Sequence, residues 1–357
     1  MEFWHKNMPK GMFLRSACDW HLDATNEHTI ENYVASFGKK PGDVEPLSLD
    51  FYHSYVEWFQ KEKGIQPVAQ YVKRLDYDRQ TQSFNAFFES QSQITARRVV
   101  IAPGFKYFPN IPDELLSKLP KDRYSHTCDY VDFSDARGKR FLLVGGRQSA
   151  FEWAALLLEA GASEVHLSHR HESPSFEISD WLWVTPIVES IAKNPGWFRN
   201  LSKSEKDEIN RRLWAEGRLK IEPWLKPRLS TPRVKLWPKT QLVNCAEREN
   251  GELTVELSDR TTLHVDKIIL ATGYKVNISN VPYLSAGNII GRLETRNGFP
   301  VLKENFETSI PGLFVTSMAA TQDFGPFFGF TIAARVSAQL ICNALSRVHL
   351  VDLYSRV

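Results

Sequence analysis

The chain has 357 residues, which favours two domains at a usual size of about 150 residues each. Charged residues make up 24% and hydrophobic residues 42%, a balance that excludes a mainly disordered chain. Lys and Arg number 44 against 42 Asp and Glu, so net charge provides no general attraction to nucleic acid or to an anionic membrane.

Apolar residues nowhere form the stretch of about 18 that a membrane helix needs, and Met1–Lys6 lacks an apolar signal-peptide core. The four cysteines are widely spaced, and no C-x-x-C occurs, which disfavours a zinc ribbon, a disulfide framework and a redox pair. We therefore expect a cytoplasmic protein without a metal site, whose cysteines are free and buried.

The first hundred residues predict one helix and several short strands. Asp50–Lys63 has aromatic residues at helical spacing and should end at Gly64. Gln66–Ser90 alternates enough for two or three antiparallel strands, with a polar turn at Asp76–Asp78. Arg97–Gly104 is a short buried strand that leads into a Pro-Gly turn.

The clearest pattern is a β-α-β unit. Phe141–Val144 is a continuous apolar segment typical of a buried parallel strand, and Gly145–Ala150 forms a turn after it. Phe151–Ala160 predicts a helix, and Glu164–Ser168 predicts the next strand. Such a crossover joins parallel strands and should be right-handed.

Further elements follow towards the C-terminus. Leu242–Asp266 predicts a strand meander with a hairpin turn at Asn250–Gly251. Lys267–Gly273 repeats the pattern of a buried strand that enters a turn of small residues. Leu313–Thr316 is another short strand, and Phe328–Leu345 predicts a C-terminal helix after Gly325-Pro326.

Six of the ten tryptophans lie between residues 181 and 237, within a segment 173–237 that also holds a charged helix, Ser202–Arg212, capped by Ser202. One interpretation is a lid or a substrate wall, because aromatic side chains give large rigid contacts. The alternatives are an insert with its own small core and a dimer contact.

The turn after Val144 matches the dinucleotide fingerprint G-x-G-x-x-G/A at its first and third positions. Backbone N–H groups at such a helix start face a phosphate. The second position is Arg147, which must either push the phosphates away or pair with them. A structural turn without a ligand is the alternative. The candidate cofactor residues here are Gly145, Gly146, Arg147, Gln148, Ser149 and Ala150.

The strand that ends at Ser168 continues into His169, Arg170 and His171. An acidic residue near this point suits the ribose of NAD, whereas an arginine suits a 2′-phosphate. We therefore favour NADPH over NADH, with His169 and Arg170 as candidates and a solvated basic loop as the alternative. Two further turns of small residues bracket the unit, and their candidates are Ala102, Gly104, Thr272 and Gly273.

The order of these motifs resembles the flavoproteins with two dinucleotide-binding domains, and within them the bacterial flavin-containing monooxygenase and N-hydroxylase-like group. The matching segments are Met8–Ser16, Val99–Gly104, Val144–Ala150, Ile268–Tyr274, Pro311–Val315 and Phe324–Phe327. The resemblance implies an α/β fold with two Rossmann-like, three-layer domains. It implies an FAD-type domain at 1–135 and 266–357, and an NAD(P)-binding domain at 136–265 with the Trp-rich insert 173–237.

The chain departs from this family pattern at two places. No G-x-G-x-x-G occurs before Gly145, so we expect the FAD-type domain to lack its first β-α-β unit. The family's acidic residue after the final strand is replaced by Thr316-Ser317-Met318.

The resemblance also implies site residues. Met12 and Arg15 would lie along FAD, and the turn Gly325, Pro326, Phe327 would face the flavin, where a helix N-terminus stabilises negative charge. A structural ion pair for Arg15 and core packing for the phenylalanines are the alternatives. His126 could touch the nicotinamide ribose or be a linker histidine without such a role.

The predicted function is an NADPH-dependent, FAD-containing oxidoreductase of the monooxygenase type that acts on a small nucleophilic nitrogen or sulfur compound. No catalytic residue is assigned, because the cofactors carry the chemistry in such enzymes. A flavin-dependent reductase or oxidase without hydroxylation is one alternative, and an FAD-less, inactive binding or regulatory protein is another. The oligomeric state stays open, with a homodimer as one option.

Overall fold

The computed structural model describes the backbone of residues 1–354 and the side chains of residues 1–346. The chain divides into two compact units, each made of three segments. Unit 1 comprises Met1–Phe13, Pro109–Trp181 and Asp207–Lys275. Unit 2 comprises Leu14–Phe108, Leu182–Lys206 and Val276–Val357.

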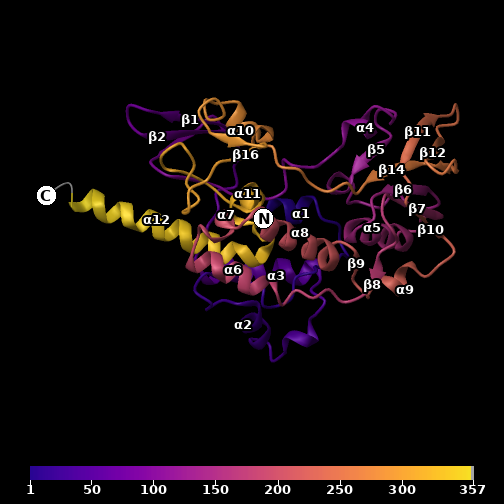
Figure 1. Cartoon of the computed structure of the whole chain (residues 1–357), viewed down its shortest axis with the longest axis horizontal. Coiled ribbons are helices and arrows are strands. Elements are labelled where there is room, and N and C mark those ends of the chain that lie inside the picture. The colour runs from indigo at the N-terminus through magenta and orange to yellow at the C-terminus, as the bar shows by residue number, and fades with distance from the viewer. Residues whose placement is uncertain (355–357) are drawn as a thin grey trace. The chain divides into compact units, whose positions relative to one another are not determined.

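Unit 1 is built on a five-stranded parallel sheet with the strand order β10-β7-β6-β14-β5 (Figure 1). A second, antiparallel sheet has the order β11-β12-β13. The elements are α1 (Glu2–Lys6), α4 (Asp113–Leu116), β5 (Tyr124–His126), β6 (Arg140–Val144), α5 (Gln148–Glu159), β7 (Glu164–His169), β8 (Ser175–Phe176), β9 (Lys220–Ile221), α9 (Leu225–Leu229), β10 (Val234–Pro238), β11 (Leu242–Glu247), β12 (Leu253–Leu257), β13 (Thr262–Val265) and β14 (Lys267–Leu270).

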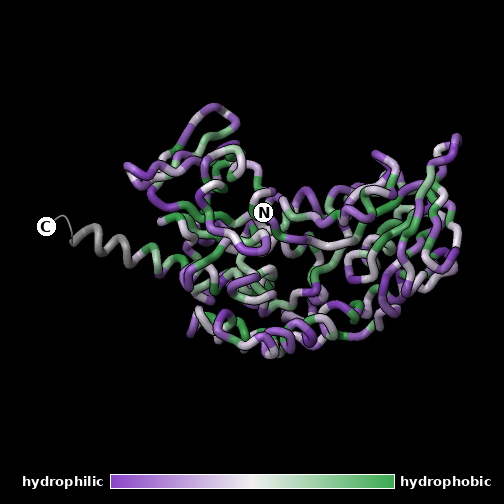
Figure 2. Tube along the Cα trace, turned by 45° about the horizontal axis from the view of Figure 1, so that its top comes forward, coloured by the Kyte–Doolittle hydropathy of each residue, from purple (hydrophilic) through white to green (hydrophobic). Residues whose placement is uncertain are grey.

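The parallel sheet is covered on both faces, which explains why its strands read as continuous apolar segments. Successive side chains point to opposite faces of a strand. Phe141 and Leu143 pack with the residues of α5, whereas Leu142 packs with those of β11–β13. Figure 2 colours the exposed hairpin tip between β11 and β12 purple, because it is hydrophilic. Unit 1 is therefore a three-layer α/β structure, as predicted.

Unit 2 combines a two-stranded parallel pair, β17-β4, with an antiparallel sheet of order β1-β2-β3 and several helices. Its elements are α2 (Ile30–Ala35), α3 (Leu49–Glu62), β1 (Val72–Asp78), β2 (Ser83–Phe88), β3 (Gln93–Ala96), β4 (Val99–Ile101), α6 (Val184–Lys193), α7 (Trp197–Asn200), α10 (Pro282–Ser285), β15 (Thr295–Arg296), β16 (Phe299–Pro300), β17 (Leu313–Val315), α11 (Thr321–Phe324) and α12 (Ala334–Tyr354). Helix α8 (Lys203–Gly217) begins in unit 2 and continues in unit 1.

Two local predictions are wrong. Asp76–Asp78 is not a turn but the end of β1, because Tyr77 is buried and pairs with Phe84 of β2. The chain reverses after Asp78, where Gln82 has a left-handed φ of 50°. The C-terminal helix begins at Ala334 and not at Phe328, because two short 3-10 turns, Pro326–Gly329 and Thr331–Ala333, precede it.

The unit boundaries differ from the expected domain boundaries. β14 pairs with both β6 and β5 in the parallel sheet of unit 1. Because β5 precedes residue 136 and β14 follows residue 265, this unit extends beyond 136–265 on both sides. The Trp-rich segment does not form one insert, because 182–206 belongs to unit 2. Its tryptophans have separate partners. Trp183 contacts Phe327 in unit 2, whereas Trp224 contacts Phe13 in unit 1.

The cysteines are free, as expected, but Cys342 is exposed on α12, whereas Cys18, Cys128 and Cys245 are buried. No helix that the structure describes combines the length and the apolar character required to cross a membrane.

A buried carboxylate ties the N-terminal segment of unit 1 to α5. Glu152 is 2% exposed and accepts hydrogen bonds from Phe13 N (3.3 Å) and Arg228 Nη1 (3.2 Å). Burial raises the pKa of the Glu152 carboxyl, and the Arg228 guanidinium opposes that shift. Arg228 also bonds to Glu159. Glu152 is thus the internal acceptor that fixes both the N-terminal segment and α9.

Replacing Glu152 should destabilise the chain strongly. Glu152→Ala leaves Arg228 partly buried with one remaining partner and leaves Phe13 N–H without its acceptor, so the free energy of unfolding should fall by about 3 kcal/mol. Glu159→Ala removes a partner that is 54% exposed and should change it by less than about 1 kcal/mol. Urea unfolding followed by circular dichroism measures both. Equal losses would contradict this assignment.

Candidate functional site

The turn after β6 has no room for side chains at its first two residues. Gly145 has φ +147°, and a Cβ there would lie 2.5 Å from Ala271 O. A Cβ on Gly146 would lie 2.5 Å from His169 Cβ. Both glycines are therefore required by close approach, one to the end of β14 and the other to the end of β7. The turn forms a small-residue cradle at the carboxyl ends of three neighbouring strands.

The first turn of α5 offers free backbone donors above this cradle. The amides of Gln148 and Ser149 are at its first two positions, where no intrahelical acceptor exists. The Ser149 side chain is exposed, and Ala150 is buried in the core. The Gln148 side chain is occupied: it accepts from Glu222 N (3.1 Å) and donates to Glu152 Oε2 (3.2 Å). The arrangement suits a phosphate at a helix N-terminus.

Arg147 occupies the N-cap position of α5 and has an extended backbone conformation. Its guanidinium lies 4.3 Å from the ring centre of Trp214. Burial, and then the charge of Arg170, lowers the pKa of Arg147. The side chain thus stacks on an aromatic platform from α8. Trp214 itself is 41% exposed and lies edge-on to His171 at 6.3 Å.

The residues after β7 divide into buried and exposed groups. The Ser168 hydroxyl is buried and bonds to Thr240 Oγ1 at 2.9 Å, so it serves the fold. His169 is 3% exposed, stacks on His171 and has no hydrogen-bond partner at Nε2 among the described residues. Burial lowers the pKa of His169. Arg170 is exposed.

The turn after β14 is held by Asn110. The Thr272 hydroxyl donates to Asn110 O, Asn110 Nδ2 donates to Thr272 O (3.3 Å), and Asn110 N donates to Gly273 O (2.8 Å). His126 is buried, with Nε2 3.0 Å from Gly273 O and Nδ1 3.0 Å from Cys128 Sγ. Burial lowers the pKa of His126. His126 therefore positions the Gly273 turn from inside the unit.

Met12 lies in the segment that packs along α5, between Gly11 and Phe13. Gly11 has φ +80°, and a Cβ there would lie 3.2 Å from Leu156. Phe13 is bonded to Glu152 through its amide. The Gly145–Ala150 turn thus lies against His169 and next to Arg170, and Thr272 and Gly273 directly follow Ala271, which Gly145 contacts. Met12 belongs to the same unit.

The remaining candidates belong to unit 2. Ala102 and Gly104 follow β4, where Ala102 is exposed and Gly104 has φ +59° with open space around its Cβ position. Arg15 is half-buried, and the next residue, Ser16, lies 3.3 Å from Thr331 through the two hydroxyl oxygens. Arg15 is therefore near the 3-10 turns that precede α12.

The turn Gly325–Phe327 is packed into unit 2. Gly325 has φ +96°, and a Cβ there would lie 3.0 Å from the Phe198 ring. Pro326 begins a 3-10 turn of four residues, so no α-helix N-terminus stands at this point. Phe327 is 1% exposed and contacts Trp183 edge-on at 5.1 Å. The Phe327 ring is thus part of the core.

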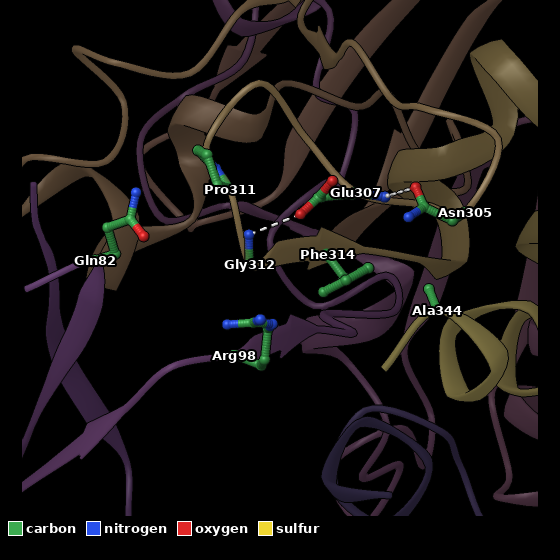
Figure 3. A pocket seen from close by; sticks show the side chains of 8 residues that line it. All are labelled: Gln82, Arg98, Asn305, Glu307, Pro311, Gly312, Phe314 and Ala344. Carbon is green, nitrogen blue, oxygen red and sulfur yellow. Dashed lines mark hydrogen bonds between the residues drawn. The ribbon is translucent and has the colours of Figure 1, made fainter. Parts of the chain in front are cut away.

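A cavity of about 150 Å³ in unit 2 lies apart from these residues (Figure 3). Its wall includes Arg98, Gly312 and Glu307, and Glu307 Oε1 accepts from Gly312 N at 2.8 Å. Arg98 and Gly312 precede β4 and β17, so they mark the amino ends of these strands. Ligands in open parallel sheets bind beyond the carboxyl ends, which makes this cavity a poor cofactor site.

One acidic cluster could resemble a metal site. Asp23, Glu27 and His28 have ligand atoms within 4.8 Å of one another. However, Asp23 accepts from the backbone of Thr25 and His28 and lies 3.1 Å from the Lys63 ammonium. Burial opposes ionisation of Asp23, but these donors outweigh it and hold its pKa far below the usual range. Lys63 already supplies the cation.

Trp214 was predicted only as a member of the Trp-rich segment, and Asn110 was not predicted. Both act across long sequence separations, on Arg147 and on the Thr272–Gly273 turn respectively. Asn110 lies in no recognisable motif, so no signal in the sequence singles it out.

The fold is shared with solved amine hydroxylases. Ornithine N-hydroxylase from Kutzneria sp. 744 aligns with a TM-score of 0.76 and 17% identity over 97% of this chain and 90% of that one. L-lysine 6-monooxygenase from Pseudomonas syringae aligns with a TM-score of 0.71 and 17% identity over 97% and 89%. At such identities the likeness shows the fold alone.

Curated relatives match in sequence. Trimethylamine monooxygenase of Methylocella silvestris is 24% identical over 202 residues, 54% of this chain and 44% of that protein. The probable indole-3-pyruvate monooxygenase YUCCA8 of Arabidopsis thaliana is 32% identical over 276 residues, 71% of this chain and 62% of that protein. The chain thus spans less than two thirds of these relatives.

The sequence model of L-lysine 6-monooxygenase/L-ornithine 5-monooxygenase matches residues 45–276, which is more than half of the chain. This match shows that the chain belongs to the L-lysine 6-monooxygenase/L-ornithine 5-monooxygenase family.

Proposed function

We propose that this protein is an NADPH- and FAD-dependent monooxygenase that hydroxylates the nitrogen of a small amine. The observation that carries the proposal is the cradle of unit 1. Neither Gly145 nor Gly146 has room for a side chain there, and the first amides of α5, which follow directly, have no intrahelical acceptor. That geometry serves a dinucleotide phosphate, and the family supplies the reaction class.

NADPH fits the residues of unit 1. The diphosphate would lie on the amides of Gln148 and Ser149, where the helix dipole favours negative charge. The adenosine would lie beyond β7, next to His169 and Arg170. The unpartnered Nε2 of the buried His169 supports a polar ligand on this side of the turn.

FAD fits unit 2 in part. The open turn at Ala102–Gly104 and the Arg15 segment supply small residues and a positive charge where the family resemblance assigns the flavin cofactor. Within the described residues of unit 2, however, the parallel pair β17-β4 carries no glycine-rich turn into an α-helix, so the FAD diphosphate lacks a helix N-terminus there. When bound, FAD would pass electrons from NADPH to molecular oxygen.

Several relatives support the proposed substrate class. Ornithine, lysine, cadaverine and trimethylamine, the substrates named for four of the similar proteins, all carry a basic nitrogen. The amines differ in size and in their other charges. A small alkyl amine is therefore the class that we propose for this chain, and the individual compound is left to the assay.

The assay begins with cofactor content. The purified chain should show flavin absorbance or acquire it with added FAD, and it should consume NADPH faster with L-ornithine, L-lysine or trimethylamine. Mass spectrometry should then detect an amine that has gained one oxygen atom. NADPH consumption without such a product would indicate a reductase or oxidase. A colourless protein that FAD cannot reconstitute would overturn the enzyme assignment.

A methyl group in the cradle should block the nucleotide. In Gly146→Ala the new Cβ would meet His169 at 2.5 Å, so the turn must shift away from its phosphate-binding position. We expect the dissociation constant for NADPH to rise at least about tenfold by isothermal titration calorimetry. Gly291→Ala is the matched control, because its Cβ enters open space. Unchanged NADPH affinity in Gly146→Ala would remove the turn from the site.

A further inference from the structure

The cavity at the amino ends of β4 and β17 has a size that limits what it can hold (Figure 3). Its volume of about 150 Å³ equals that of an engineered apolar cavity that holds one benzene molecule. The space therefore suits a ligand of about six non-hydrogen atoms, which is far smaller than a flavin or a nicotinamide nucleotide. All of the residues that line it belong to unit 2, so the cavity is complete within one unit.

Arg98 contributes a positive charge to this cavity without a carboxylate partner. Its side chain is half-buried, and Nη1 donates to the backbone oxygen of Arg97 at 3.0 Å. Among the residues that the structure describes, Arg98 forms no ion pair and no other side-chain hydrogen bond. Because a guanidinium carries five N–H donors in a fixed fork, most of the donors of Arg98 are open to a ligand.

The other polar groups of the wall also favour an acceptor as the ligand. Asn305 Oδ1 accepts from Glu307 N (3.1 Å), which leaves the Asn305 amide nitrogen as an open donor. The Glu307 carboxylate is engaged on both oxygens, by Gly312 N (2.8 Å) and by Lys303 Nζ (2.8 Å). Arg98 and Lys303 together outweigh this single carboxylate. The cavity therefore favours a ligand that accepts hydrogen bonds and carries negative charge.

The wall that holds these groups is preformed. Gly312 has φ +80°, and a Cβ there would lie 2.6 Å from Arg97 O, so the turn into β17 has little freedom to move. Phe314, the middle residue of β17, is 2% exposed and pairs with Val100 of β4. A wall that is fixed before the ligand arrives lowers the ordering cost of binding.

Apolar side chains complete the lining and restrict the kind of anion. Pro311, Phe314 and Ala344 come from the turn before β17, from β17 and from α12. They suit a hydrocarbon chain, whereas inorganic phosphate would turn polar oxygens towards them without hydrogen bonds. A carboxylate suits Arg98, because its two oxygens accept parallel N–H bonds from one guanidinium.

We propose that this cavity binds a short-chain monocarboxylate of about six non-hydrogen atoms, and that Arg98 binds its carboxylate group. In this arrangement the alkyl chain lies against Phe314 and Ala344, and the Asn305 amide nitrogen offers a further donor. The proposal goes beyond the proposed function, because neither the flavin, NADPH nor the amine takes part in it. Loss of any of those activities would leave this site intact.

The test is ligand-observed NMR with butyrate, which has the required size and charge. Saturation-transfer titration should give a dissociation constant of about 1 mM, which a ligand of this size can reach. Butyramide has the same size without the charge, and inorganic phosphate has the charge without the chain. Both should bind at least about tenfold more weakly than butyrate. Equal affinity for butyramide would remove Arg98 from the site, and equal affinity for phosphate would overturn the monocarboxylate class.

Substitutions of Arg98 test the anion contact. Arg98→Gln removes the charge and should weaken butyrate binding at least about tenfold. Arg98→Lys keeps the charge without the bidentate geometry and should weaken it by about threefold. Arg211→Gln, an exposed arginine of α8 in unit 1, is the matched control and should leave the dissociation constant within about twofold. Unchanged butyrate affinity in Arg98→Gln would overturn the proposal.

A filled cavity tests the same site from α12, and it keeps the proposal testable should Arg98→Gln fail to fold. Ala344→Leu adds bulk to the lining without altering Arg98 and should weaken butyrate binding at least about tenfold. Asn343→Leu adds the same side chain at the neighbouring exposed position and should have no effect. Far-ultraviolet circular dichroism should show both variants folded. Full butyrate affinity in a folded Ala344→Leu would place the ligand elsewhere and contradict the assignment.

Discussion

The site depends on one close approach, between Gly145 and the carbonyl of Ala271. β6 and β14 are neighbours in register, with Val144 opposite Leu270, so both strands end at the same level of the sheet. The next residues must pass each other, and a side chain at Gly145 would meet the Ala271 oxygen at 2.5 Å. This backbone contact lets the chain turn directly into α5, whose first amides then stand over the strand ends. Every other feature of the candidate nucleotide site is arranged around that turn.

Charge in unit 1 is organised on the two sides of α5. At the inner side, Glu152 is buried and receives donors from Phe13 and Arg228, which fixes the N-terminal segment against the helix. At the helix start, positive charge is left uncompensated at Arg147. The same helix therefore carries a satisfied carboxylate in its core and an unsatisfied cation at its N-terminal end. The first arrangement stabilises the fold, and the second leaves a positive charge beside the proposed phosphate site.

Local patterns in the sequence predicted the β-α-β unit well, because an apolar strand, a glycine turn and an amphipathic helix are contiguous. The strands and the helix lie within three residues of their expected bounds. Ser202 caps α8 as predicted, because its hydroxyl oxygen accepts a hydrogen bond from Glu205 N. The polar residues of Asp76–Asp78 led to the wrong prediction of a turn, since charged residues also occur along the less buried side of β1. The sequence predicted the Trp-rich segment to be one insert, although its tryptophans pack in different units. Contacts such as Arg147 with Trp214 depend on where α8 lies, which no local pattern specifies.

Arg147 raises a steric question, because the fingerprint has glycine at its position to admit the diphosphate. The backbone there is extended, with φ −114° and ψ −179°, a conformation open to any residue, so no left-handed geometry demands glycine. The side chain stacks on Trp214, so its guanidinium is engaged with α8. The close approach is instead provided by Gly145 and Gly146, because the ends of the neighbouring strands leave no room for a Cβ at either residue. The substitution thus adds a cation beside the proposed phosphate site while the small residues that form the cradle are retained.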